Sequence, residues 1–371
     1  MHISQRAQRV SPSGIRRMFD LGARLKDPVD LSIGQPHFDV PAPIQEAAID
    51  AIRKGRNRYT VTQGLPELNE AVLDLVQQRT GVRPESSMIT GGVAGGLMLG
   101  MLTLLDQTDR VLIPDPYFIC YESLGNLLTE QPAYYDLYPD FRVTEECLEA
   151  GMREDVKVLI LNSPSNPTGR VLDEDELKAA ARFARRHDLP IISDEIYEAF
   201  SYEGAAPSIL SYYDQVVLLG GFGKTYGMPG WRLGYAVGPT DVIDRMRTLQ
   251  QFSYVCAPTP GQYASLVALS VDMTPYIDDY RNRRDRMVNG LSDVMSIVRP
   301  SGAFYVFPEA PGRDGARAFA DLAVKKNLLV VPGTSFSRRD THLRLSYALP
   351  DDKLDRGIAL LRELVAEVLA Q

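Results

Sequence analysis

Residues 216–235 read VVLLGGFGKTYGMPGWRLGY and place Lys224 in a glycine-dense turn between two apolar runs. A lysine is costly to bury without a partner, so this position needs a reason. The side chain either reaches solvent along the loop or holds an amine that reacts with a carbonyl to give a Schiff base. Taken alone, the stretch favours the first explanation, and the rest of the chain decides between the two.

Short apolar runs alternate with helical stretches on the N-terminal side of this turn. The runs cover residues 111–113, 156–161, 191–193 and 216–219. Between two of them, Asp173 is a typical N-cap for a helix with an acidic first turn and basic residues at 185–187. Continuous apolar strands separated by helices predict a mostly parallel sheet that is buried on both faces and holds ligands at its carboxyl edge.

The last third of the chain has a different pattern. Residues 270–296 predict one or two charged helices, and residues 351–370 predict a final helix with one apolar face. Strands are expected within residues 298–308, 328–331 and 343–347. This mixture indicates a separate, smaller α+β domain.

The bulk composition excludes several classes of protein. With 371 residues, 44% hydrophobic and 24% charged, the chain has the composition of an ordinary globular protein and a length that favours two domains. A net charge of −8 argues against nucleic acid as a partner. No apolar run approaches the roughly 20 residues of a membrane span, and the N-terminus lacks a secretory signal, so we expect a cytoplasmic protein. The few cysteines and histidines are far apart, so we expect neither a disulfide framework nor a metal site.

Three further stretches bring polar groups to the ends of predicted strands. They are TGGVAGGL at residues 90–97, NSPSNPTG at 162–169 and SDEIY at 193–197. The glycines allow backbone N–H groups to approach an anion at a helix N-terminus, although their spacing matches neither a Walker loop nor a dinucleotide fingerprint. The prolines hold the Asn166 amide rigidly, and Asp194 at the end of a buried strand needs a cationic partner. A tight turn and a helix cap are the alternative explanations for the first and last stretches.

Together with the lysine turn, these stretches resemble the aspartate-aminotransferase-like family of class I/II aminotransferases, which are fold-type I enzymes dependent on pyridoxal 5′-phosphate (PLP). Weaker matches in the family's order are IGQP at 33–36, YTVTQGLPEL at 59–68, PDPYF at 114–118, GAFY at 302–305, PGT at 332–334 and LRLS at 343–346. The resemblance implies a large PLP-binding α/β domain, residues 41–260, with a mostly parallel seven-stranded sheet covered by helices. Residues 1–40 and 261–371 would form the small α+β domain.

The resemblance also implies how the cofactor ring is held. Lys224 would form the Schiff base and then move a proton as a free amine. Asp194 would pair with the pyridine nitrogen, and Tyr197 and Asn166 would hydrogen-bond the 3′-oxygen of the ring. Phe118 would stack on the ring face, where the family usually has tyrosine or tryptophan.

The phosphate and the substrate are assigned in the same way. Arg232 and the backbone N–H groups of Val93 and Ala94 would bind the cofactor phosphate. Tyr59 would reach the phosphate of a neighbouring subunit, which implies a homodimer. Arg344, helped by the backbone around Gly34 and by Asn166, would bind the substrate α-carboxylate. An arginine in an apolar strand can also be half of a structural ion pair.

The chain departs from the family at the lysine turn. Where the family commonly has Ser-x-Ser-Lys, this sequence has Gly221-Phe222-Gly223-Lys224 and so lacks a serine that donates to the phosphate. The loss of one charge-assisted hydrogen bond is worth about 1.5–3 kcal/mol. Ser193 or Tyr59 are candidates to replace that donor.

The expected reaction is transfer of an amino group between an L-amino acid and a 2-oxo acid, by a ping-pong mechanism through a lysine Schiff base. A neutral or aromatic donor is favoured over aspartate, because residues 248–260 contain no Arg or Lys and the glycine loop contains no lysine for a distal carboxylate. The same fold also serves PLP-dependent β-lyases (carbon–sulfur lyases) and cyclising lyases, and a non-catalytic ligand sensor is the alternative from another class.

Overall fold

A computed structural model describes residues 2–12 and 14–370 of the chain. Its strands are β1 Val29–Asp30, β2 Ser86–Thr90, β3 Arg110–Asp115, β4 Ala133–Asp136, β5 Val156–Asn162, β6 Ile191–Asp194, β7 Val216–Gly221, β8 Gly234–Gly238, β9 Tyr305–Val306, β10 Leu328–Leu329, β11 Val331–Pro332 and β12 Leu343–Ser346. Its α-helices are α1 Gln5–Gln8, α2 Gly14–Gly22, α3 Ala42–Arg53, α4 Pro66–Thr80, α5 Gly92–Leu104, α6 Ile119–Leu128, α7 Glu145–Gly151, α8 Glu174–His187, α9 Phe222–Thr225, α10 Thr240–Ser253, α11 Thr259–Ala268, α12 Thr274–Leu291, α13 Gly315–Lys325 and α14 Asp351–Leu369. Short 3₁₀ turns occur at η1 Ile209–Ser211, η2 Pro229–Trp231 and η3 Gly333–Ser335.

A seven-stranded sheet forms the centre of the larger lobe, in the order β2-β8-β7-β6-β5-β3-β4. The strands from β7 to β4 in this order are parallel, and β8 runs antiparallel to both of its neighbours. The expected α/β fold with a mostly parallel seven-stranded sheet is therefore confirmed. Alternate residues of β5 pack into separate hydrophobic clusters, Leu159 and Leu161 into one, Val158 and Ile160 into the other. Helices cover both faces because both faces are apolar.

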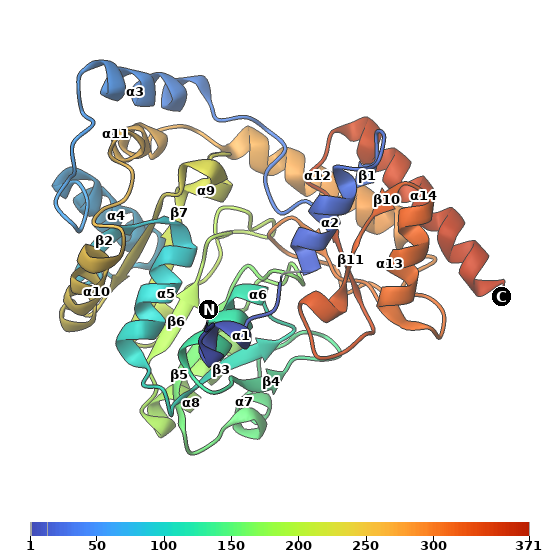
Figure 1. Cartoon of the computed structure of the whole chain (residues 1–371), viewed down its shortest axis with the longest axis horizontal. Coiled ribbons are helices and arrows are strands. Elements are labelled where there is room, and N and C mark those ends of the chain that lie inside the picture. The colour runs from blue at the N-terminus through green and yellow to red at the C-terminus, as the bar shows by residue number, and fades with distance from the viewer. Residues whose placement is uncertain (1, 13, 371) are drawn as a thin grey trace.

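The smaller lobe is built from segments of both terminal parts of the chain, with α2 and β1 beside the C-terminal elements α12 to α14 (Figure 1). Near the N-terminus β1 pairs in parallel with β10, and β11, β12 and β9 form an antiparallel three-stranded sheet beside them. Of the strand expected within residues 298–308, only β9 is regular, and the charged segment 270–296 holds the single helix α12. We propose a domain boundary at residue 41, as expected from the sequence, and a second one after α11 in place of residue 260, because α11 packs against α3 and α4 of the larger lobe.

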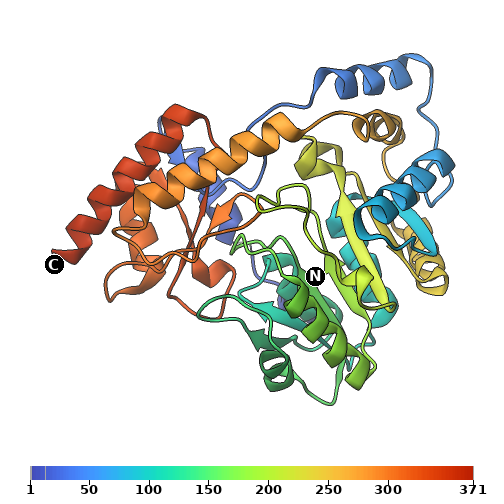
Figure 2. The same cartoon turned by 180° about the vertical axis from the view of Figure 1, so that it is seen from behind.

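Local side-chain chemistry determines where α8, the helix expected after Asp173, begins. The Asp173 side chain accepts from the Glu176 backbone N–H, and the Glu176 side chain accepts from the Asp173 backbone N–H, which makes a complete capping box. Acidic residues occupy the first turn of α8 and basic residues the last turn, as the helix dipole favours. Seen from behind, the green α8 lies across the sheet (Figure 2).

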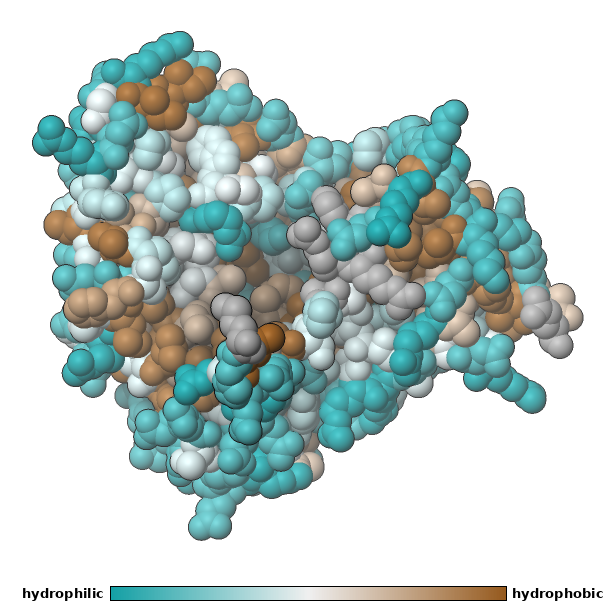
Figure 3. Space-filling model, in the orientation of Figure 1, coloured by the Kyte–Doolittle hydropathy of each residue, from teal (hydrophilic) through white to brown (hydrophobic). Residues whose placement is uncertain are grey.

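The carboxyl ends of the central strands meet at one edge. Asn162 at the end of β5 is the register partner of Asp194 at the end of β6, and Asp194 is the partner of Leu219 in β7. The surface is hollowed between the two lobes on this side (Figure 3). In the described part of the chain, none of the helices is long and apolar enough to cross a lipid bilayer.

Candidate active site

A cavity of about 310 Å³ lies at the carboxyl ends of β5, β6 and β7. Its lining includes every site residue expected from the sequence except Tyr59. The β-strands deliver Asp194 and Arg344, helix N-terminal turns deliver Val93, Ala94 and Phe118, the short helix α9 delivers Lys224, and loops deliver the others. Side chains from distant parts of the sequence therefore converge on one enclosed space.

Lys224 reaches this cavity from α9, directly after β7. Its Nζ donates a hydrogen bond of 2.5 Å to the Gly34 carbonyl and lies 5.7 Å from the centre of the Tyr197 ring. Burial lowers the pKa of Lys224 to about 8, and the positive charges of Arg344 and Arg232 act in the same direction. The amine is therefore neutral in a larger fraction of molecules than an exposed lysine at the same pH.

Asp194 is held at the end of β6 and is only 3% exposed. Tyr121 donates from its hydroxyl to Asp194 Oδ2 at 2.6 Å, and the Ile196 backbone N–H donates to Oδ1 at 3.2 Å. Burial raises the pKa of Asp194 to about 6, although these hydrogen bonds oppose the shift. The site thus keeps a carboxylate that gains from a cationic partner inside the cavity.

Tyr197 and Asn166 face the cavity from two loops. The turn after β6 brings Tyr197 beside Asp194 as expected, and its hydroxyl lies 3.0 Å from that of Tyr305. The Asn166 backbone N–H donates to Asn162 Oδ1 at 2.9 Å, which fixes the Asn166 side chain in the cavity wall. Both side chains therefore present polar groups in one orientation.

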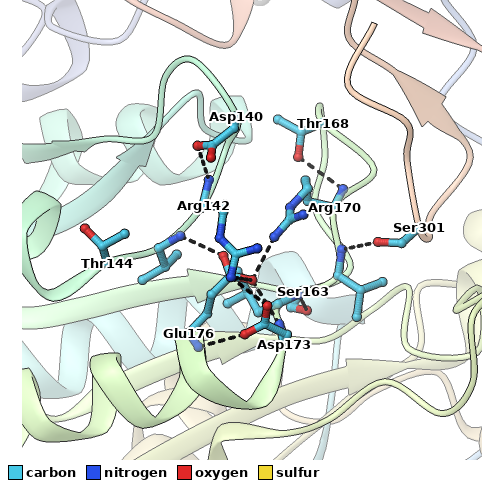
Figure 4. A network of polar contacts seen from close by, with 12 residues as sticks. Asp140, Arg142, Thr144, Ser163, Thr168, Arg170, Asp173, Glu176 and Ser301 are labelled. Atoms are coloured by element: carbon cyan, nitrogen blue, oxygen red, sulfur yellow. Dashed lines mark hydrogen bonds and ion pairs between the residues drawn. The ribbon is translucent and has the colours of Figure 1, made fainter.

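A network of polar contacts holds the loop that carries Asn166 (Figure 4). Arg170 donates to Glu176 Oε2 at 2.7 Å, which ties the loop to the capping box at the start of α8. The Ser163 hydroxyl accepts from the Leu172 backbone N–H, and the Ser301 hydroxyl accepts from that of Val171. The loop is thus anchored both to α8 and to the smaller lobe.

Arg344 in β12 is 1% exposed and lies between the rings of Tyr305 and Phe336, with its guanidinium carbon 4.4 and 4.6 Å from their centres. It donates to Asn166 Oδ1 at 3.1 Å and to the Ser32 carbonyl at 2.7 Å, while its Nε has no hydrogen-bond partner. Burial lowers the pKa of Arg344. Among the described residues, no carboxylate forms an ion pair with it, which argues against the structural ion pair considered from the sequence.

The glycine loop makes an anion seat at the start of α5. The N-cap residue Gly91 provides no side-chain cap, so the first N–H groups of the helix are free for a ligand. Gly92 has φ +75°, and a Cβ there would stand 2.8 Å from Arg232 Nη2. Arg232 donates to the Pro229 and Gly91 carbonyls at 3.1 and 3.4 Å, and among the described residues no carboxylate pairs with it. The Arg232 guanidinium and the free N–H groups at the start of α5 therefore lie close together, in space that a side chain at Gly92 would fill.

The two candidate replacements for the missing serine are placed differently. The Ser193 hydroxyl donates to Glu195 Oε1 at 2.9 Å and does not line the cavity, so the suggestion that it replaces the serine is wrong. It faces the opposite side because adjacent strand residues alternate, and its neighbour Asp194 points into the cavity. Tyr59 is 81% exposed and lies outside the cavity of its own chain. At Gly221 a Cβ would meet Ile196 and the Gly234 backbone at 3.0 and 3.2 Å, so the space a serine needs is tight.

Sequence reasoning missed Tyr121 and Tyr305 as site residues. Tyr121 follows Phe118 by three residues in α6, so helical spacing could have placed both rings on one face. Tyr305 lies in the GAFY stretch noted from the sequence, but nothing local shows that its hydroxyl meets Tyr197 and its ring meets Arg344.

The residues present fit pyridoxal 5′-phosphate. The Arg232 cradle that a Cβ at Gly92 would fill suits a phosphate, and the buried Asp194 suits a protonated ring nitrogen. Lys224 supplies an amine with a lowered pKa in the same cavity. Arg344, with an unpartnered Nε, suits a carboxylate.

Comparison with known proteins agrees with this chemistry. The family model described as aminotransferase class I and II matches residues 26–361. A "probable aspartate aminotransferase" of Methanocaldococcus jannaschii is 34% identical over 98% of this chain and 99% of its own length. "Aromatic-amino-acid aminotransferase 2" of Thermococcus litoralis is 33% identical over 99% of both chains. The structure of Thermus thermophilus aspartate aminotransferase with maleate superposes with a TM-score of 0.92 at 32% identity, covering 98% of this chain and 100% of that one.

Proposed function

The chain belongs to the class I and II aminotransferases, and from that premise we propose that it moves the amino group of a neutral or aromatic L-amino acid to a 2-oxo acid. It is a PLP-dependent aminotransferase that works by the family's ping-pong mechanism. The preference for the donor and the roles of individual residues are our proposals.

The proposal rests mainly on one observation, the buried Arg344 guanidinium that has no carboxylate partner among the described residues. The Arg344 side chain is 1% exposed and keeps one nitrogen without a hydrogen bond. A buried, unpaired charge lowers the stability of the fold. A substrate α-carboxylate that accepts a bidentate pair of hydrogen bonds from the guanidinium offsets this cost. Asn166, bonded to Arg344, and the backbone around Gly34 complete the site for the α-carboxylate.

When bound, PLP supplies an electron sink for the bonds at the substrate Cα. Asp194 would pair with the ring nitrogen of the cofactor, Tyr197 and Asn166 would hydrogen-bond its ring oxygen, and Phe118 would pack on its face. Arg232 and the N–H groups of Val93 and Ala94 would bind its phosphate. Lys224 would hold the cofactor and, as a free amine, would accept a proton from the substrate Cα at Nζ. A pKa of about 8 suits that base, since near neutral pH it can both accept and return a proton.

The charges around the cavity support a neutral or aromatic donor. Among the described lining residues the only cations are Lys224, Arg232 and Arg344, and each already has a role. A second carboxylate from aspartate would therefore enter without a cationic partner, at a cost in binding free energy. Apolar side chains such as Ile15 and Leu97 line the same cavity and suit an apolar substrate.

We also propose a homodimer in which Tyr59 binds the phosphate of the partner's cofactor. The Tyr59 side chain is 81% exposed, yet its loop is firmly held by α11, through Thr259 Oγ1 donating to the Arg58 carbonyl and Gln262 Nε2 donating to Thr60 Oγ1. A rigid loop that presents an exposed aromatic side chain suits a contact with another subunit.

The test is an amino-donor panel in single-turnover reactions with the purified holoenzyme, read by the absorbance change of the cofactor. We expect the largest kcat/KM with an aromatic or branched apolar amino acid and a value at least roughly tenfold lower with aspartate. The Arg344→Gln variant is expected to lose activity with all donors alike. Release of ammonia together with a 2-oxo acid, with no amino group left on the cofactor, would indicate a β-lyase. Faster reaction with aspartate would contradict the donor preference.

A further inference from the structure

We propose that Gln250 and Tyr254 are positioning residues that set the phosphate seat of one subunit and, through the Tyr59 loop, that of its partner. The inference rests on the proposed homodimer, in which Tyr59 serves the neighbouring subunit. Neither Gln250 nor Tyr254 lines the cavity, so both act through other groups.

Tyr254 fixes the glycine loop from outside the cavity. Its hydroxyl accepts the Gly91 backbone N–H at 2.9 Å, while the Gly91 carbonyl accepts from Arg232 Nη2 at 3.4 Å. The Gly91 peptide is thus held on one side by Tyr254 and on the other by the arginine proposed to bind phosphate.

The Tyr254 ring also explains why this loop is so rich in glycine. A Cβ at Gly91 would stand 3.3 Å from the ring, and a Cβ at Gly95 would stand 3.0 Å from the hydroxyl. Both distances are shorter than ordinary van der Waals contact, so the loop and the ring fit each other only because these two residues lack side chains.

Gln250 connects Tyr254 to the loop that carries Tyr59. The Tyr254 hydroxyl donates to Gln250 Oε1 at 2.7 Å, and Gln250 Nε2 donates to the Thr62 and Ile89 carbonyls at 2.6 and 3.0 Å. Gln250 is fully buried, so water cannot replace these bonds. Its amide has one orientation, because two carbonyls face the nitrogen and a hydroxyl proton faces the oxygen.

The connection runs from Gly91 through Tyr254 and Gln250 to Thr62, three residues from Tyr59. At one end it sets the N–H groups at the start of α5, and at the other end it sets the tyrosine offered to the partner. A shift of the Gln250 amide therefore changes two phosphate contacts in two different active sites.

Gln262 offers a matched control. It is also fully buried and holds the same Tyr59 loop, accepting from the Leu65 backbone N–H at 2.8 Å and donating to Thr60 Oγ1 at 3.2 Å. None of its hydrogen bonds involves Gly91 or Tyr254. Removing this amide frees the Tyr59 loop and the Ala257 carbonyl, to which Gln262 Nε2 donates at 2.8 Å, and leaves the hydrogen bonds of Gly91 and Tyr254 in place.

The experiment measures cofactor affinity in mixed dimers of full-length chains. One subunit keeps Lys224 and reports cofactor capture by absorbance, and the other carries Lys224→Ala and is silent. Gln250→Met, Tyr254→Phe, Gln262→Met or Tyr59→Phe is placed either in the reporting subunit or in the silent one. Each dimer, freed of cofactor, is titrated with PLP and with pyridoxal, which lacks the phosphate.

We expect Gln250→Met to weaken PLP binding by on the order of tenfold from either subunit, because unsatisfied buried groups displace both loops. Tyr254→Phe should weaken binding only from the reporting subunit, and Gln262→Met and Tyr59→Phe only from the silent one. Pyridoxal affinity should stay within about twofold of the unmodified dimer throughout, since a phosphate-specific effect cannot appear without the phosphate.

The inference is overturned if Gln250→Met acts from one subunit only, or if it weakens pyridoxal as much as PLP, which would indicate general loss of structure. Tyr254→Phe keeps the ring in place and so tests the first half of the connection even where Gln250→Met folds poorly. If Tyr59→Phe has no effect from the silent subunit, the shared site of the proposed dimer is itself wrong. If it has that effect and Gln250→Met does not, only the positioning role fails.

Discussion

A half-buried lysine and a buried aspartate define the site at the level of single residues. Lys224 and Asp194 have pKa values displaced toward neutrality mainly by burial, the lysine downward and the aspartate upward. Each group is thereby made dependent on a partner that the cofactor supplies.

The lowered pKa of Lys224 predicts the pH dependence of cofactor capture. Only the neutral amine attacks an aldehyde, so the capture rate should rise with pH and level off above a midpoint of about 8. In Arg344→Gln the midpoint should move upward, because a neighbouring positive charge is removed. Stopped-flow absorbance of apoenzyme mixed with PLP checks both. A rate that still climbs above pH 10 in the unmodified enzyme would contradict the lowered pKa.

The raised pKa of Asp194 predicts a conflict between stability and function. The folded state holds this proton more tightly than the unfolded state, so the ionised carboxylate lowers stability, fully above pH 6 and not at all below the ordinary pKa near 4. Asp194→Asn should therefore stabilise the apoenzyme at pH 8 by up to ~3 kcal/mol, with a smaller gain at pH 5. Urea unfolding at the two pH values measures this. The same variant should lose nearly all transaminase activity. A stabilisation by Asp194→Asn that is larger at pH 5 than at pH 8 would contradict a raised pKa of Asp194.

At the scale of the element, the start of α5 is shaped by what surrounds its glycines. Gly91 and Gly95 leave room for the Tyr254 ring, and Gly92 leaves room for Arg232. The sequence pattern of this loop is compatible with a tight turn or with an anion site, and the surrounding side chains favour the anion site.

Gly92→Ala and Gly81→Ala should separate backbone strain from damage to the anion seat. Both glycines have φ +75°, but a Cβ at Gly81 meets nothing within 4 Å, whereas one at Gly92 meets Arg232 Nη2 at 2.8 Å. Each variant should lose roughly 1–2 kcal/mol of stability from the left-handed backbone. Only Gly92→Ala should also lose PLP affinity, by roughly tenfold or more. Thermal unfolding and PLP titration test this, and equal PLP affinity in the two variants would argue against a phosphate seat at Gly92.

At the level of the whole molecule, the lobe around α3, α10 and α11 carries exposed apolar side chains of the kind found at subunit interfaces. Phe252 is 83% exposed, Tyr59 81% and Ile52 54%, and brown residues gather over α3 in Figure 3. The loop proposed to reach the partner's phosphate follows α3 and is hydrogen-bonded to Gln250 of α10, so we expect association and cofactor binding to involve the same side of the molecule.

A charge in this patch should therefore separate the subunits and weaken cofactor binding together. Phe252→Asp is expected to shift the sedimenting species from two chains to one at low micromolar concentration and to lower PLP affinity. Leu369→Asp is the control, because Leu369 is 64% exposed at the end of α14, on the opposite side of the molecule (Figure 1). A dimeric Phe252→Asp, or a monomeric unmodified chain, would contradict the proposed interface.

Sequence patterns alone predict the α/β order and most of the cavity lining. Apolar runs and helical periodicity are local patterns, so the strands before Lys224, the Asp173 cap and the sheet edge that holds Asp194 could all be predicted. The family motifs added Arg344, Arg232, Asn166 and the other expected residues of the cavity.

The partners of these residues become visible only in the folded chain. Tyr121 donates to Asp194 across 73 positions of sequence, and Gln250 reaches Thr62 across 188. The same holds for the absence of an ion pair at Arg344 within the described chain and for the engagement of Ser193 with Glu195. Local patterns indicate which way a side chain tends to face, but the groups it meets depend on elements that folding brings together from elsewhere in the chain.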